Sequence, residues 1–310
     1  MKWIKSQETA LPHFKSSVLT IGNFDGVHLG HQKLLMEVLA QSKNYNVPSV
    51  VCTFRPHPRT VLRPQEPYHR MFDYRDQFEV MTKMGIDFLI EEKFSKDFSL
   101  MAAEEFLENY IEKIFNPKHL VVGYDFNFGK LRSGNAEFLR QFCQSKKWGL
   151  TIVPAFEKDG QIISSSQIRK LLEHGDLKKV EEYLGRPYYL RGPVRLGYKR
   201  GRLLGVPTAN LSPEIDFVPR KGVYFTWAYL KDKKMPSITN IGYNPTFENS
   251  DSYIKVETHL FNFDEDIYGE HLKVELCQFH RDEIKFGSFE LLKTQIHKDL
   301  SLAKNYFGIA

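Results

Sequence analysis

Residues 20–32 read TIGNFDGVHLGHQ: the end of an apolar run, a glycine-rich turn, an acidic residue and two histidines. The apolar run 17–22 predicts a buried strand, and residues 31–42 carry leucine and valine at helical spacing. Doubly wound folds bind phosphate where a strand leads through a glycine-rich turn into a helix, because the first amides of the helix point outward with partial positive charge. His28 and His31 flank the helix start, so both imidazoles can face one anion.

A structural role for this stretch stays open. In that case Gly22, Gly26 and Gly30 would only form turns, and the two histidines would bond to neighbouring groups or bind a metal ion.

Composition limits the classes of protein. A length of 310 residues favours two domains, and 42% hydrophobic with 26% charged residues is typical of a globular chain. The net charge of +5 comes from scattered Lys and Arg, which fits anionic small molecules at least as well as nucleic acid. Cys52, Cys143 and Cys277 form no CxxC pair, so neither a disulfide framework nor a zinc ribbon is expected. No run has the length of a signal peptide core or a membrane span, and a cytoplasmic protein is expected.

The hydrophobic pattern changes near residue 186. Before it, apolar runs predict strands that alternate with helices, and Ser99 is the expected N-cap of the second helix. The strands are expected at 17–22, 49–54, 86–92, 119–126 and 150–156, and the helices at 31–42, 100–115 and 135–147. This alternation predicts an α/β fold, a parallel sheet with helices on both faces. Two short helices follow, SQIRKLLEHG and DLKKVEEYLG, with Gly175 and Gly185 as C-caps.

From Tyr188 onward the pattern is all-β. The candidate strands, separated by turn residues, are 188–197, 222–231, 236–242, 253–261 and 272–280. This spacing predicts a small barrel or sandwich, and a helix at 288–306 closes the chain. Two domains are therefore expected, 1–185 and 186–310.

The opening stretch carries a family resemblance. GNFDGVHLGHQ resembles the HxGH signature of the nucleotidylyltransferase superfamily, in the GxFDGxHxGH form of prokaryotic bifunctional riboflavin kinase/FAD synthetases. Further segments similar to this family follow in the expected order from about residue 16 to residue 300: TFRPHP (53–58), GYDFNFGKLRSGN (123–135), ISSSQIR (163–169), GRPY (185–188), RGRLLGVPTANL (200–211), GVYFTW (222–227), TNIGYNPTF (239–247), VETHLF (256–261) and YGEHLKVEL (268–276).

The resemblance implies a Rossmann-like nucleotidylyltransferase domain followed by a barrel-shaped riboflavin kinase domain. The second domain would phosphorylate the 5′-hydroxyl of riboflavin with ATP to give FMN. The first would transfer AMP from ATP to FMN, giving FAD and pyrophosphate. Mg²⁺ is the implied cofactor, and the implied partners are small molecules, with neither nucleic acid nor membrane among them.

For adenylyl transfer, the resemblance implies that His28, His31 and Arg169 are catalytic. The implied nucleotide-binding residues of this domain are Gly22, Phe24, Asp25, Gly26, Gly30, Ser164, Ser165 and Ser166. The implied flavin-binding residues are Phe54, His57, Pro58, Asp125, Phe126 and Phe128. Core packing is the alternative for the phenylalanines, and a helix cap with a surface arginine is the alternative for the SSSQIR segment. Asn135 stands where the family more often has Asp, which leaves a charged role there in doubt.

For the kinase reaction, the resemblance points to Glu257 as the general base, because a neutral alcohol needs one. Alternation places Lys255, Glu257 and His259 on one face of their strand, where an ordinary solvent-exposed glutamate is the alternative. Thr208 and Asn210 carry the hard oxygen atoms that suit Mg²⁺. The implied nucleotide-binding residues of this domain are Gly197, Gly201, Gly205 and Pro207. The sequence has no GxxxxGK[ST] motif, which disfavours a P-loop kinase.

Two other functions stay open at this stage. One is an enzyme in which a single half works, which the motifs in both halves argue against. The other is a non-catalytic flavin- or nucleotide-binding regulator, which the joint presence of His28, His31, Arg169 and Glu257 argues against. A tRNA ligase is disfavoured because no anticodon-binding domain is recognisable. The sequence leaves the oligomeric state undetermined.

Overall fold

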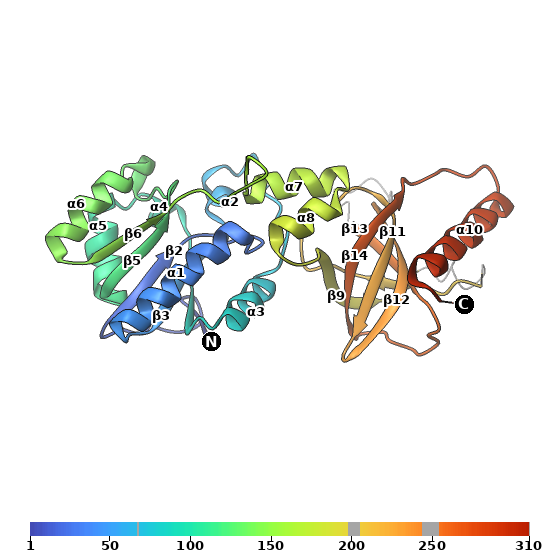
Figure 1. The fold of residues 1–310 in the computed structure, drawn as a ribbon, viewed down its shortest axis with the longest axis horizontal. Helices are drawn as coiled ribbons and strands as arrows, with labels where there is room; N and C mark the ends of the chain where they lie inside the picture. Colours follow the sequence, from blue (N-terminus) through green and yellow to red (C-terminus); the bar gives the residue numbers. More distant parts are fainter. Residues whose placement is uncertain (67, 198–204, 244–253, 310) are drawn as a thin grey trace. The chain divides into compact units, whose positions relative to one another are not determined.

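The computed structural model describes residues 1–66, 68–197, 205–243 and 254–309. The chain forms two compact units, Met1–Ser165 and Ser166–Ala310, which are described separately below (Figure 1). In the described part of the chain, no helix is both long enough and apolar enough to cross a membrane.

The first unit is built on a six-stranded sheet in the order β1-β4-β3-β2-β5-β6. The strands are β1 (Lys2–Lys5), β2 (Ser17–Ile21), β3 (Ser49–Arg55), β4 (Phe88–Lys93), β5 (Pro117–Gly123) and β6 (Gly149–Val153). All neighbours pair in parallel, as predicted. The edge strand β1 was not predicted. Because β2 lies between β3 and β5, the turn that follows it leaves the sheet at the point where the strand order reverses, the usual ligand position in such folds.

Helices cover both faces of this sheet, which confirms the doubly wound prediction. Val18 and Leu19, adjacent on β2, belong to different core clusters. The cluster around Val18 includes Leu35 of α1 (Leu29–Tyr45) and Met81 of α3 (Tyr74–Met84). The cluster around Leu19 is completed by η1 (Phe106–Phe115) and α6 (Ala136–Lys146). The helix α3 was not predicted.

The connection between β4 and β5 differs from the single predicted helix. It consists of α4 (Lys96–Ser99), α5 (Ala103–Glu105) and the π-helical η1. Ser99 is therefore not an N-cap. It is the last residue of α4, and α5 follows Ala102, which forms no side-chain cap hydrogen bond. Ser95 caps the preceding helix α4, since its hydroxyl accepts the Phe98 N–H at 3.1 Å. Between α4 and α5 the carbonyl of Met101 accepts a hydrogen bond from the N–H of Lys130, so the chain pairs with a distant loop there.

Short elements complete the connections in both units. They are α2 (Pro58–Leu62), η2 (Lys130–Arg132), β7 (Glu157–Lys158), β8 (Gln161–Ile162), α7 (Ser165–His174) and α8 (Leu177–Leu184). Gly175 and Gly185 follow α7 and α8 with φ of 77° and 70°, the left-handed conformation expected of glycine after a helix.

The second unit is a closed antiparallel barrel in the order β10-β13-β12-β11-β14-β9 (Figure 1). The strands are β9 (Tyr189–Arg195), β10 (Ala209–Leu211), β11 (Gly222–Leu230), β12 (Lys233–Tyr243), β13 (Ile254–Leu260) and β14 (His271–Arg281). The five predicted strands are present. The short β10 was not predicted, and it closes the barrel by pairing with both β13 and β9.

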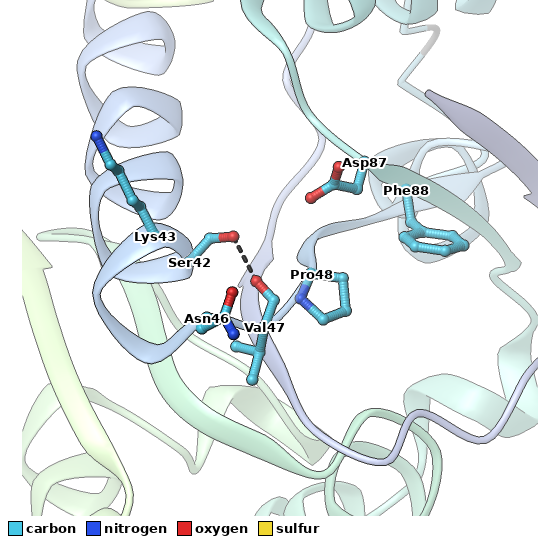
Figure 2. Close-up of a pocket in the computed structure, with 7 residues that line it drawn as sticks. All are labelled: Ser42, Lys43, Asn46, Val47, Pro48, Asp87 and Phe88. Carbon is cyan, nitrogen blue, oxygen red and sulfur yellow. Dashed lines mark hydrogen bonds between the residues drawn. The ribbon is translucent and has the colours of Figure 1, made fainter.

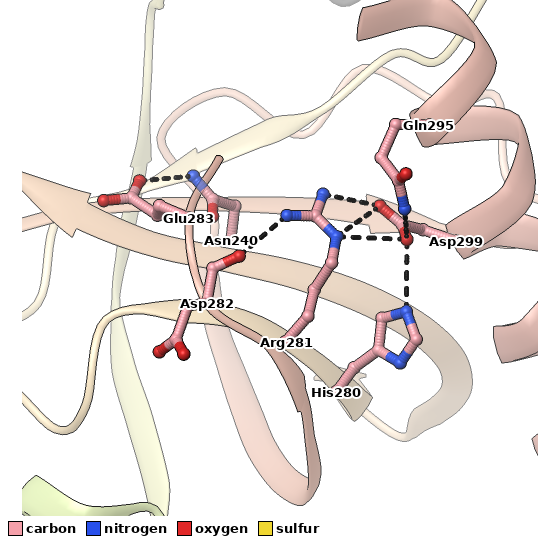
Figure 3. A network of polar contacts seen from close by, with 7 residues as sticks. All are labelled: Asn240, His280, Arg281, Asp282, Glu283, Gln295 and Asp299. Carbon is pink, nitrogen blue, oxygen red and sulfur yellow. Dashed lines mark hydrogen bonds and ion pairs between the residues drawn. The ribbon is translucent and has the colours of Figure 1, made fainter. Parts of the chain in front are cut away.

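The closing helix α10 (Phe289–Phe307) begins after the N-cap Ser288. Its Ala303 packs with Val223 and Phe225 of β11 and Ile238 of β12. A polar network ties the same helix to the end of β14 (Figure 3). In this network the side chain of Asp299 is 4% exposed and receives three hydrogen bonds from the guanidinium of Arg281, two from Nε at 3.1 and 3.0 Å and one from Nη2 at 2.6 Å. It also faces Nε2 of His280 at 3.1 Å.

This network predicts a large stability effect. We expect Asp299→Ala to lower the free energy of unfolding of the barrel by about 3–5 kcal/mol, because the substitution leaves the partly buried Arg281 without its counter-ion. Amide hydrogen exchange on β11 and β14 in the full chain measures this change. The matched control is Glu265→Ala, which breaks the exposed Lys233–Glu265 pair and should cost under about 1 kcal/mol. A loss below about 1 kcal/mol for Asp299→Ala would contradict the assignment.

Candidate active sites

The turn after β2 is held in an uncommon backbone conformation. Phe24, Gly26 and Val27 have φ of 50°, 83° and 40°. The turn ends at His28, the N-cap residue of α1, whose imidazole accepts the N–H of His31 at 3.3 Å. The histidine therefore takes the place of the usual Ser, Thr or Asp cap, and the first turn of α1 starts at the carboxyl edge of the sheet.

The two histidine rings lie against each other. Their centroids are 3.7 Å apart with an interplanar angle of 18°. Gly30 leaves room for this arrangement, since a Cβ there would lie 3.2 Å from the His28 ring. Nδ1 of His28 is an acceptor, so the neutral ring carries its proton on Nε2. Burial, and then the neighbouring His28, lower the pKa of His31 well below its ordinary value, so this imidazole is neutral near pH 7.

Two segments that are far apart in the sequence meet at this turn. The hydroxyl of Ser165 donates to the backbone carbonyl of Asp25 at 2.8 Å. This contact brings Ser165 of the ISSSQIR segment to the glycine-rich turn. Ser164 is half-buried and Ser166 is exposed. Arg169 lies on α7 in the second unit, and its part in the site stays a prediction.

The predicted flavin residues lie in the last part of β3 or after the carboxyl ends of β3 and β5, the two strands beside β2. His57 caps α2, and Pro58 is the first residue of that helix. Phe54 is half-buried, and Asp125 is exposed in the turn after β5. Phe126 stacks on Phe128 with centroids 5.4 Å apart. Phe128 is 8% exposed and belongs to the core, as the packing alternative predicts for at least one of these rings.

A pocket of about 410 Å³ lies at the amino ends of the sheet strands (Figure 2). It is lined by Ser42, Lys43, Asn46, Val47, Pro48, Asp87 and Phe88. Ser42, Lys43 and Asn46 lie at the end of α1, Val47 and Pro48 precede β3, and Asp87 and Phe88 lie at the start of β4. The pocket is therefore at the amino ends of these strands. Doubly wound folds bind their ligands at the carboxyl ends, and this pocket is therefore not the candidate site.

In the barrel, the predicted catalytic and metal-binding residues lie side by side. Asn210 of β10 is directly opposite Glu257 of β13, and Asn240 of β12 is opposite Glu257 on the other side. Directly opposed residues of antiparallel strands point to the same face, with Cβ atoms about 4.5–5.5 Å apart. Nζ of Lys255 lies 2.9 Å from the Glu257 carboxylate. Thr208, half-buried, immediately precedes β10.

The structure describes only some of the predicted nucleotide-binding residues of the barrel domain. Gly201 lies outside the described residues. A Cβ on Gly197 would clash with the Asn210 side-chain amide, so the backbone passes close to that side chain. Gly205 has a φ of 71°, and the carbonyl of Pro207 accepts a hydrogen bond from Nδ1 of His259 at 2.8 Å. Burial lowers the pKa of His259, although this bond opposes the effect.

Metal binding by clustered side chains is not indicated in the described ranges, where no three His, Cys, Asp or Glu residues gather. A Mg²⁺ held by one or two protein oxygens and by phosphates needs no such cluster, because this ion keeps several waters.

Sequence reasoning missed several residues of these sites. Tyr68 and Met71 both donate to the Asp25 carboxylate, and Gln77 donates to the carbonyl of Asn23. These donors lie 43 to 54 positions away from the groups they contact, and no local pattern marks them. Asn240 could have been found from the sequence, because it lies within the TNIGYNPTF segment that resembles the family. In the barrel it is directly opposite Glu257.

Comparison with known proteins gives a family match for each half of the chain. The family model for FAD synthetase matches residues 11–167, and the family model for riboflavin kinase matches residues 184–307. Two curated relatives, both named bifunctional riboflavin kinase/FMN adenylyltransferase, come from Haemophilus influenzae and Bacillus subtilis. The first is 37% identical and covers 99% of this chain and 100% of its own. The second is 36% identical and covers 94% and 93%.

The chain belongs to the bifunctional riboflavin kinase/FMN adenylyltransferase family. In this chain the FAD synthetase match precedes the riboflavin kinase match, which is the order that the sequence predicted.

A solved structure of a Streptococcus pneumoniae protein, titled a macrolide-efflux protein, is also similar. It is 31% identical with a TM-score of 0.85, over 98% of this chain and 99% of its own. This likeness supports the fold. The name macrolide-efflux protein belongs to the Streptococcus pneumoniae protein. The two family models that match the present chain describe flavin enzymes.

Proposed function

We propose that this bifunctional enzyme converts riboflavin to FMN at the barrel and FMN to FAD at the glycine-rich turn. The observation that carries this proposal is the pair of sites in separate units. One is a stacked histidine pair at the start of α1, and the other is a glutamate opposite an asparagine on the barrel wall. Each site has the groups that its own reaction requires. We take 1–185 and 186–310 as the functional modules.

Adenylyl transfer needs charge stabilisation more than a base. An oxygen of the FMN phosphate attacks the α-phosphorus of ATP, and the bond to the β-phosphate breaks to release pyrophosphate. The nucleophile is already anionic at neutral pH. His28, the neutral His31 and the amides at the start of α1 would bind the charge that develops on the α-phosphate. Ser164, Ser165, Ser166 and Arg169 would hold the pyrophosphate, where the guanidinium can bridge two oxygens.

The first module must also hold two ligands in one orientation. The backbone around Gly22, Phe24, Asp25, Gly26 and Gly30 would approach the nucleotide. The flat, largely apolar flavin ring suits the rings at the ends of β3 and β5, and Asp125 would lie near them. These are the aromatic rings of Phe54, His57, Phe126 and Phe128 and the apolar ring of Pro58.

In the kinase reaction the nucleophile is a neutral alcohol. Glu257 would accept the proton of the riboflavin 5′-hydroxyl as its oxygen attacks the γ-phosphorus of ATP and ADP leaves. The hydroxyl of Thr208 and the amide oxygen of Asn210 fit Mg²⁺ because they are hard oxygen donors beside the base. The ion would neutralise phosphate charge there. Gly197, Gly201, Gly205 and Pro207 would lie along the phosphates.

The test is incubation of the chain with riboflavin and ATP, followed by separation of the flavins by chromatography. With Mg²⁺, FMN should form first and FAD second. After chelation of the metal, both products should fall at least about 100-fold, since unneutralised phosphates repel the attacking oxygen. FMN without FAD would show that only the kinase half is active. FAD formed only from added FMN would show that only the adenylyltransferase half is active. Flavin binding without any product would instead identify a non-catalytic binder.

We also place these reactions in the cytoplasm. Cys52, Cys143 and Cys277 are free thiols, which fits a reducing compartment.

A further inference from the structure

The turn that presents His28 is strained. Phe24 and Val27 both lie in the left-handed region, with φ of 50° and 40°. This conformation is uncommon for residues other than glycine, and it is an outlier for a β-branched residue such as valine. Backbone of this kind persists only where surrounding contacts over-determine it. Other parts of the chain must therefore hold the turn.

Residues 68–77, which we call the clamp segment, supply such contacts. The hydroxyl of Tyr68 donates to Oδ2 of Asp25 at 3.1 Å, and the N–H of Met71 donates to the same oxygen at 3.4 Å. The side-chain amide of Gln77 donates to the carbonyl of Asn23. Asp25 is 2% exposed, so water cannot readily replace a donor that is lost. The clamp segment thus holds the turn on both sides of Phe24.

The clamp segment is itself fixed in place. The Tyr68 ring stacks on His57 with centroids 3.8 Å apart and an interplanar angle of 14°. Arg70 donates to Oε1 of Gln77 at 3.2 Å, which turns the amide nitrogen of Gln77 toward Asn23. A capping box formed by Asp73 and its N3 residue then starts α3. The donors that face the turn are therefore preorganised.

We propose that Tyr68 and Gln77 are positioning residues for adenylyl transfer. They hold the strained turn in the conformation that places His28 and the start of α1 at the transferred phosphate. Neither residue needs to touch a substrate. The inference rests on the proposed function and adds to it the means by which the histidine is aligned. Misplacement of a catalytic group by about 1 Å is enough to cost a large factor in rate.

The experiment uses the full chain with two conservative variants. Tyr68→Phe keeps the stacked ring and removes the hydroxyl, and Gln77→Met keeps the length and removes the amide. For each, we expect kcat of FAD formation from FMN and ATP to fall about 10-fold, with each KM changed less than about threefold. FMN formation from riboflavin, measured on the same preparation, should be unchanged.

A spectroscopic readout separates positioning from a general loss of structure. The Hε1 proton resonances of His28 and His31 carry mutual ring-current shifts, since the rings stack at 3.7 Å. These resonances should move in both variants. The matched control, Tyr45→Phe, alters an exposed tyrosine at the other end of α1 and should change neither the rate nor the resonances.

Three results would overturn the inference. They are an FAD-forming kcat within twofold of wild type, an equal fall in both reactions, and a fall in rate with unmoved histidine resonances. If the wild-type chain forms FAD while one of these results is found, the proposed function stands and the positioning role fails. If the wild-type chain forms no FAD, both fail.

Discussion

FAD formation should fall about 10²–10³-fold in His28→Ala, while FMN formation from riboflavin continues at the wild-type rate. The loss follows from the removal of one preorganised donor at the transferred phosphate, which is worth about that factor in comparable sites. The kinase reaction is spared because it takes place in the other unit. The measurement is the rate of FAD formation from added FMN and ATP, beside the rate of FMN formation from riboflavin.

His28 also caps α1, so the alanine variant removes a structural contact together with the imidazole. The control is His28→Asn, because asparagine is a good N-cap but lacks the ring nitrogen that we propose donates to the phosphate. We expect this variant to keep the stability of α1 and still to lose most of its FAD formation. If His28→Asn kept more than a tenth of the rate, the role of this residue would be capping.

The opposite pattern is expected for Glu257→Gln. Glutamine has the size of glutamate but cannot accept the proton of the alcohol, so the rate of FMN formation should fall about 10²–10⁴-fold. FMN supplied from outside should still be converted to FAD at the wild-type rate. Steady-state assays of each reaction, with its own substrate added, measure the two effects separately.

The barrel offers a matched control for this substitution. Glu275 lies on β14 and approaches Lys273 two positions away at 3.5 Å, much as Glu257 approaches Lys255. Glu275→Gln should therefore keep the kinase rate within about twofold of wild type. This substitution also removes one negative charge, but at a position on β14 that is not opposite Asn210. A kinase loss below fivefold in Glu257→Gln, or an equal loss in both variants, would exclude Glu257 as the base.

Local sequence was sufficient to predict those elements whose pattern lies within one continuous segment. The buried run before Gly22 gave a central strand, and the glycines after α7 and α8 have the positive φ expected of helix ends. Local sequence was not sufficient to place the boundaries of neighbouring short helices. Ser99 was expected as an N-cap, but it is the last residue of α4, and Ser95 caps that helix. Asn135, which stands where the family more often has Asp, is the N-cap of α6: its side-chain oxygen accepts the N–H groups of Glu137 and Phe138.

The sequence by itself determined the two-module order, the strand–turn–helix around His28 and the residue types that the two reactions need. Each of these features depends on short-range periodicity or on a motif within one segment. Only the tertiary structure decided which distant groups meet: Ser165 and Tyr68 at Asp25, and Asn210 beside Glu257. The physical reason is that strand register and side-chain hydrogen bonds across 40 to 140 positions depend on how whole elements pack, which no local window of sequence contains.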